Sequence, residues 1–212
     1  MAIRSVQRAA VEAGADAARA QLRRVRADSS AHLSLDDVLA LGEFFAGRGL
    51  APLSIEVLDQ AVADTPSSGA ARLSLGRAQE VAGRLDQALG SYRRAQALGA
   101  DREETGRLVR WVKERLAARA RPVALDPRAL ARYPGRYAEL RVTMREGRLF
   151  YSGGAYPASP LTPMTERLFE VTAEPTARVR FDDVGSGRAA RIVVLYSDGT
   201  ADLAGRASPS SP

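Results

Sequence analysis

The stretch that decides the fold of the first half is residues 71–96, ARLSLGRAQEVAGRLDQALGSYRRAQ. Five of the residues in it repeat residues that lie 34 positions earlier in the chain. The repeated pairs are Leu39 and Leu73, Leu41 and Leu75, Gly42 and Gly76, Gly49 and Gly83, and Ala61 and Ala95. Gly42 and Gly76 lack a side chain, which lets a second helix approach closely, while Gly49 and Gly83 suit the turn after a helix. A fixed period of this kind predicts stacked helical hairpins.

Read from Leu35 and from Gly69 as first positions, both segments resemble the tetratricopeptide repeat. The matching residues are Leu41, Gly42, Phe45, Gly49, Ser54, Leu58, Ala61 and Pro66 in the first repeat, and Leu75, Gly76, Gly83, Ala88, Tyr92 and Ala95 in the second. Gln79 and Ala100 depart from the pattern, because they stand where an aromatic residue and a closing proline are expected. The resemblance implies one repeat over 35–68 and another over 69–102.

The flanks extend this helical domain to residues 1–121. Residues 1–34 resemble a degenerate half-repeat with Gly14 at its turn. Residues 103–120 place four apolar residues on one face, as a capping helix at the end of a repeat array should. These residues are Leu108, Trp111, Val112 and Leu116.

From Pro122 onward the composition changes, and eight of the twelve aromatic residues lie in this part. Alternating runs such as LRVTMR (140–145) and ARVRF (177–181) predict strands, with Val142 and Met144 on the buried face. Glu146-Gly147 and Asp198-Gly199 suit tight hairpin turns. We therefore predict an α+β chain: a short tetratricopeptide-type helical-hairpin array, then a small antiparallel β-sheet or half-barrel over 122–207, and a disordered tail at 208–212.

The β part carries a second resemblance, through Tyr133-Pro134-Gly135-Arg136-Tyr137 and the order of its hairpins. It resembles the small domain that follows the catalytic domain of penicillin-binding-protein-like (class C β-lactamase-like) serine hydrolases. That resemblance implies an alternative function, a detached or truncated accessory portion that works beside a separately encoded hydrolase domain. The hydrolase motifs themselves are absent, because Lys113 is the only lysine and Arg110 stands three residues before it, where the nucleophilic serine belongs.

The residues that other kinds of catalytic or metal site require are also scarce in the sequence. The chain has no cysteine and one histidine, His32, in the polar segment DSSAHLS, so a zinc site is not expected. Asp182-Asp183 could contribute to a cation site, but a strand ending in a polar turn explains the pair better. We predict no catalytic residue, no metal and no cofactor, and therefore a protein that is not an enzyme.

Charge and hydropathy limit the classes of partner that the sequence predicts. The net charge of +6 is spread along the chain and does not predict a nucleic-acid-binding surface. The first residues contain neither a signal peptide nor a membrane span. The sequence as written therefore predicts a cytoplasmic protein, which would be exported only as part of a longer precursor.

The leading hypothesis is a protein-interaction module. The repeat resemblance implies a groove lined by the first helix of each hairpin and a protein or peptide partner. The groove positions are Asp36, Leu39, Glu43, Ala46, Ala70, Leu73, Arg77 and Glu80. Two alternatives stay open: the groove could be filled by the chain's own first helix or by the β domain, or the β domain could bind a small ligand through its aromatic residues. Those aromatic residues are Tyr137, Tyr151, Tyr156 and Phe181.

Overall fold

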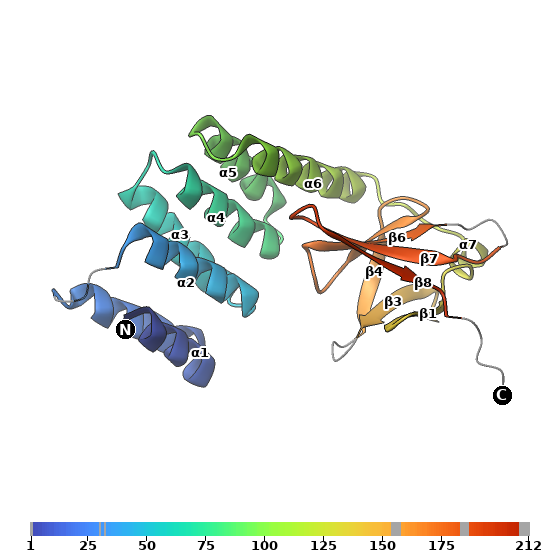
Figure 1. The fold of residues 1–212 in the computed structure, drawn as a ribbon, viewed down its shortest axis with the longest axis horizontal. Helices are drawn as coiled ribbons and strands as arrows, with labels where there is room; N and C mark the ends of the chain where they lie inside the picture. The colour runs from blue at the N-terminus through green and yellow to red at the C-terminus, as the bar shows by residue number, and fades with distance from the viewer. Residues whose placement is uncertain (1, 30, 32, 154–157, 183–186, 208–212) are drawn as a thin grey trace. The chain divides into compact units, whose positions relative to one another are not determined.

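The structure is a computed structural model that describes residues 2–29, 31, 33–153, 158–182 and 187–207 (Figure 1). The chain divides into two compact units, Met1–Val112 and Lys113–Pro212, which we call the helical unit and the β unit. Helices come first and an antiparallel sheet follows, so the predicted α+β class is confirmed.

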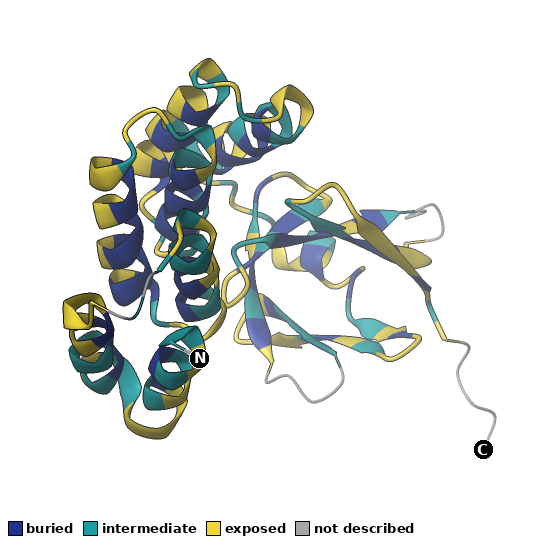
Figure 2. Ribbon diagram, turned by 60° about the vertical axis from the view of Figure 1, so that its left-hand side comes forward, coloured by how far each residue is buried: buried dark blue, intermediate teal, exposed yellow. Residues whose placement is uncertain are grey.

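Six helices precede the sheet region along the described chain, and a short seventh leads into the first strand. Their bounds are α1 Ala2–Ala27, α2 Leu35–Gly47, α3 Ala51–Asp64, α4 Gly69–Val81, α5 Leu85–Ala97, α6 Arg102–Ala120 and α7 Pro127–Leu130. The division between the two units falls inside α6, after Val112. The helices of the helical unit bury the faces that they turn toward one another (Figure 2).

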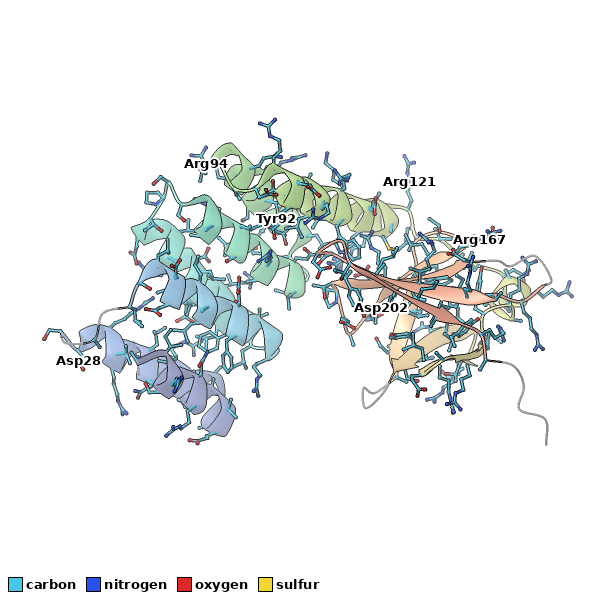
Figure 3. The ribbon with its side chains drawn as sticks, viewed as in Figure 1. Asp28, Tyr92, Arg94, Arg121, Arg167 and Asp202 are labelled. Carbon is cyan, nitrogen blue, oxygen red and sulfur yellow. The ribbon has the colours of Figure 1, made fainter. Side chains whose placement is uncertain are left out.

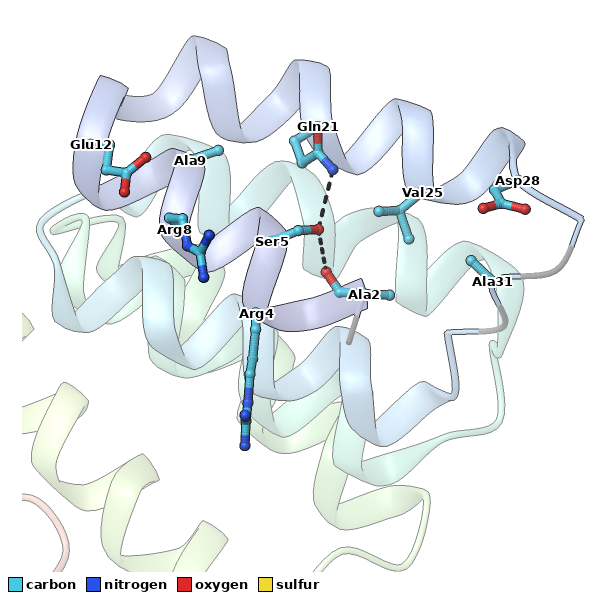
Figure 4. A pocket seen from close by; sticks show the side chains of 10 residues that line it. All are labelled: Ala2, Arg4, Ser5, Arg8, Ala9, Glu12, Gln21, Val25, Asp28 and Ala31. Atoms are coloured by element: carbon cyan, nitrogen blue, oxygen red, sulfur yellow. Dashed lines mark hydrogen bonds between the residues drawn. The ribbon is translucent and has the colours of Figure 1, made fainter.

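The first helix, α1, consists of two limbs that meet at Gly14, where the backbone leaves the helical region with φ 80° and ψ −165°. The limbs lie side by side, and the Gln21 amide donates a hydrogen bond of 3.1 Å to the Ser5 hydroxyl (Figure 4). Val6 and Leu22, one from each limb, belong to a buried cluster with residues of α2 and α3. α1 is therefore a hairpin stacked on the next one.

The two predicted repeats form the hairpins α2–α3 and α4–α5. Each hairpin turns at a glycine with φ +73°, Gly49 in the first and Gly83 in the second, a conformation that favours glycine. Ser34 caps α2 through a reciprocal pair of hydrogen bonds with Asp37, and the Ser68 hydroxyl accepts from a backbone amide of α4.

Close helix packing explains the other repeated glycines. A Cβ atom on Gly42 would lie 2.6 Å from the Leu58 side chain, and one on Gly76 would lie 2.6 Å from the Tyr92 ring. Tyr92 is fully buried, its side chain lies among the helices (Figure 3), and its hydroxyl donates a hydrogen bond of 2.7 Å to the Glu80 carboxylate. Moving the ring away from a new Cβ would therefore disturb a buried contact and this hydrogen bond.

The departure at Gln79 has a local compensation. Its side-chain oxygen accepts a hydrogen bond of 2.7 Å from the Ser91 hydroxyl, and both residues are buried. A polar pair between α4 and α5 therefore occupies the place where the repeat pattern has an aromatic ring. Because both partners are hydrogen-bonded, burying them avoids the cost of an unsatisfied polar group.

The β unit contains an eight-stranded antiparallel sheet whose strand order follows the sequence. Its strands are β1 Gly135–Tyr137, β2 Leu140–Arg145, β3 Arg148–Gly153, β4 Ser159–Pro163, β5 Leu168–Val171, β6 Ala177–Asp182, β7 Arg191–Tyr196 and β8 Ala201–Gly205. A bridge between Tyr137 and Arg206 brings the end of β8 beside β1 and nearly closes the half-barrel. The hairpin turns predicted at Glu146-Gly147 and Asp198-Gly199 are present, with positive φ at both glycines.

The interior of this half-barrel is aromatic. Tyr133 stacks on Phe181 with ring centroids 4.3 Å apart, and Phe169 meets both rings edge-on. Gly135 lies within β1, and its missing side chain leaves room for the Arg206 guanidinium. Met144, expected on the buried face, is 41% exposed because it lies near the hairpin end of β2.

The last residues of α6 meet the outer face of the sheet through charged side chains. Arg115 is 1% exposed and donates to the Glu170 carboxylate at 2.6 Å, while Arg178 pairs with Glu114. Glu170 and Arg178 are partners across β5 and β6, which joins the two ion pairs. Leu116, expected on the buried face of this helix, is only half-buried, because Arg115 occupies the buried place.

The glycine packing yields a matched pair of substitutions. Gly76→Ala should lower the free energy of unfolding by about 1–3 kcal/mol, because the new methyl group overlaps the buried, hydrogen-bonded ring of Tyr92. Gly90→Ala, on the exposed side of α5 with nothing within 4 Å of the new Cβ, should raise it by about 0.5–1 kcal/mol. Urea unfolding followed by circular dichroism measures both. An unchanged midpoint for Gly76→Ala would contradict this packing.

Candidate interaction face on the first helices

The eight predicted groove residues lie on the first helices of the two hairpins, four on α2 and four on α4. Asp36, Glu43 and Ala70 are exposed, and Leu39, Ala46, Leu73 and Arg77 are half-buried. We call these seven residues, together with Glu104 of α6, the first-helix face. Seven of the eight predicted residues thus reach the surface of the helical unit.

Glu80 is the exception. It is 2% exposed, and its carboxylate accepts the hydroxyl hydrogen of Tyr92 inside the α4–α5 hairpin. The carboxylate therefore stabilises the hairpin and is not presented to a partner. The repeat pattern places this position near the surface, but the reach of the tyrosine hydroxyl draws the side chain inward.

Three charged residues from three successive first helices meet on this face. One terminal nitrogen of the Arg77 guanidinium lies 3.5 Å from a Glu43 oxygen, and the other pairs with Glu104. Arg77 and Glu43 therefore lie on the same side of the array, as expected from their equivalent places in the repeats. Glu104 is fixed in turn by the first turn of α6, where its amide donates to the Asp101 carboxylate at 2.7 Å.

Sequence reasoning missed Glu104 because residues 103–120 were assigned to a capping helix. The signal that could have found it is the period itself, since Glu104 stands 34 residues after Ala70 and Ala70 stands 34 after Asp36. The start of α6 therefore takes the place of the first helix of a third hairpin. The same helix continues into the residues of the β unit.

The apolar part of the face is half-buried. Leu39 packs against a buried cluster that contains Leu58 and Leu75, and Leu73 lies at the equivalent position of α4. Each leucine therefore still exposes part of its surface. Removing such surface from water is the main source of affinity for a docked segment.

The period continues into α1, where an open pocket of about 1000 Å³ lies along both limbs (Figure 4). Its lining residues are Ala2, Arg4, Ser5, Arg8, Ala9, Glu12, Gln21, Val25, Asp28 and Ala31. Four of them, Ala2, Ser5, Ala9 and Glu12, stand 34 residues before Asp36, Leu39, Glu43 and Ala46. The lining mixes two arginines with two carboxylates and does not favour one sign of charge.

The β unit contains fewer features that could form a binding site. Tyr137 and Phe181 are fully buried core residues, Tyr151 is half-buried, and Tyr156 lies outside the described residues. Two smaller pockets, of about 270 and 460 Å³, flank Met164 beside the end of α6.

Metal and membrane sites receive no support from the described residues. Within them no three His, Cys, Asp or Glu side chains are grouped as metal ligands would be. Asp182 pairs with Arg180 at 3.0 Å, while Asp183 and His32 lie outside the described residues. No helix in the described part of the chain combines the length and the apolar character needed to cross a membrane.

No protein-family model, no curated protein and no solved structure matches this chain. The resemblances to the tetratricopeptide repeat and to the hydrolase-associated domain therefore remain predictions.

Tyrosines near one end of the sheet are held in the protonated form. The pKa of Tyr196 is raised to about 12, first by burial and then by the hydrogen bond of 3.1 Å that its hydroxyl donates to Asp202 on β8. Burial also raises the pKa of Tyr151, and the charges of Glu174 and Asp202 add to that effect.

These shifts predict a loss of stability in alkali. Below pH 10 both the folded and the unfolded chain keep the Tyr196 proton, so the shift has no effect on stability there. Between about pH 10 and 12 the unfolded chain releases the proton while the folded chain holds it, so stability falls as pH rises. Urea midpoints measured from pH 8 to 11 should fall less steeply for Tyr196→Phe than for the wild type. Parallel curves for the two proteins would show that Tyr196 does not contribute.

Proposed function

We propose that the protein is a non-catalytic interaction module that binds a peptide or protein segment on the first-helix face. The observation that carries the proposal is the meeting of Glu43, Arg77 and Glu104, from α2, α4 and α6, beside the half-exposed Leu39 and Leu73. Charged groups that orient a ligand and apolar groups that supply burial lie side by side on one surface.

The position of α1 supports the proposal, since this hairpin packs against a different side of α2. Its buried cluster includes Leu41 and Phe45, whereas Leu39 packs against the cluster formed with α4. The alternative in which the chain's own first helix fills the groove therefore has no support from these contacts.

The absence of an activated nucleophile among the described residues supports a non-catalytic role. A serine or threonine hydroxyl is a weak nucleophile unless a base lies within hydrogen-bond reach. The serine and threonine hydroxyls that the structure places in hydrogen bonds contact backbone carbonyls, amides and other uncharged groups, or a carboxylate in a turn. Such contacts stabilise turns and helix packing.

Site-specific photo-crosslinking tests the binding surface. A benzophenone side chain introduced at Ala70, exposed on α4, should form adducts with proteins of the native cell extract. The control is the same side chain at Ala63, which is exposed on α3, the second helix of the first hairpin. It should form few adducts. Leu73→Gln should reduce the adducts at position 70, because it removes apolar surface beside the probe. Equal adduct yields at positions 70 and 63 would remove the first-helix face from consideration.

The non-catalytic assignment has its own measurement. The purified chain should hydrolyse neither a chromogenic β-lactam nor a p-nitrophenyl ester faster than buffer, because the described residues contain no recognised pairing of nucleophile and base. Turnover that disappears on substitution of a single serine would contradict the assignment.

A further inference from the structure

We infer that the first-helix face selects a basic, amphipathic segment of a protein partner, one that presents lysine or arginine side chains together with apolar ones. The inference rests on the proposed function, since it names the chemistry of the partner that this face would bind. It follows from how the charges of the face are paired.

The single guanidinium of the face is already occupied. Both terminal nitrogens of Arg77 contact carboxylates of this chain, one that of Glu43 at 3.5 Å and the other that of Glu104. An arginine held between two carboxylates has few donors left for an anionic ligand. Arg77 therefore positions its two neighbours and is not the group that receives a partner's carboxylate.

The carboxylates of the face outnumber the guanidinium. Glu43 keeps 55% of its side chain exposed and Glu104 keeps 30%, so each can accept a further hydrogen bond. Asp36 adds another exposed carboxylate on α2. The next pair along α6, Glu103 and Arg107, is balanced within itself at 2.9 Å. The net charge of the face is negative.

Leu39 lies between Asp36 and Glu43 along α2, and Leu73 holds the equivalent position on α4. A ligand that covered both leucines would bring its own side chains next to Glu43. Lysine and arginine side chains suit the position next to Glu43, because their aliphatic parts add apolar contact while their charged ends reach the carboxylates.

The charge of the whole chain acts in the opposite direction, which makes the inference testable. With a net charge of +6, unspecific attraction would favour an acidic ligand over a basic one. A preference for a basic ligand can therefore arise only from a local acidic surface.

The experiment measures fluorescence anisotropy of the full chain with three labelled twelve-residue peptides. All three carry leucine at the same helical positions, and the remaining positions are lysine, glutamine or glutamate. We expect the lysine peptide to bind most tightly and the glutamate peptide most weakly. Binding of the lysine peptide should weaken as salt increases, because exposed charges are screened.

Four variants locate the effect. Glu43→Gln should weaken binding of the lysine peptide about two- to fivefold, and Arg77→Gln should tighten it by a similar factor, because it frees two carboxylates. Asp59→Asn makes the same change of charge as Glu43→Gln on the exposed surface of α3, and should have no effect. Leu73→Gln should weaken all three peptides if they bind on this face. Circular dichroism confirms that each variant is folded.

Several outcomes would overturn the inference: tighter binding of the glutamate peptide, weaker binding of the lysine peptide by Arg77→Gln, an equal effect of Asp59→Asn, or no binding of any peptide. The photo-crosslinking at position 70 separates this failure from failure of the proposed function. Adducts at position 70 together with a preference for the glutamate peptide would leave the interaction face in place and reverse the sign of its partner.

Discussion

The contact on which the helical unit depends is the approach of a large side chain to a glycine, Leu58 against Gly42 and Tyr92 against Gly76. In both hairpins the side chain occupies the volume that a Cβ would need. This closeness sets the distance between the two helices of each hairpin and repeats it 34 residues later. Residues one period apart, such as Glu43 and Arg77, therefore come within reach of each other on neighbouring first helices.

The two hairpins use different polar chemistry to hold the same packing. In the first, the Ser54 hydroxyl donates to the Gly42 carbonyl at 2.7 Å. In the second, Glu80 and Gln79 of α4 bond to two side chains of α5. Buried polar pairs that are fully hydrogen-bonded fix one arrangement of the helices, because any shift would leave a buried group without its partner. The register of the first-helix face is thus set by contacts beneath it.

The sequence predicts the parts of this structure that depend on local conformation. Turn glycines, alternating strands and the 34-residue period are properties of neighbouring residues, and they predicted the helices and the hairpin order. The sequence did not predict the contacts that depend on how far a long polar side chain extends. Glu80 turns inward to a tyrosine hydroxyl, Arg115 replaces Leu116 on the buried side of α6, and Glu104 pairs across to α4. Long polar side chains can satisfy several partners, and only the three-dimensional arrangement decides which one.

The many arginines show why net charge is a poor guide to partners in this chain. In the β unit, Arg206 donates to the Ala189 carbonyl at 2.6 Å and to the Tyr137 hydroxyl at 2.9 Å, where the two ends of the half-barrel approach each other. Arg115 and Arg178 are buried against carboxylates. Burying a guanidinium is costly unless its donors are paired, so an arginine used in this way has little left to offer a ligand. Several arginines of the chain are therefore paired inside the fold. The charge that a partner meets depends on which residues are exposed on the face that it contacts.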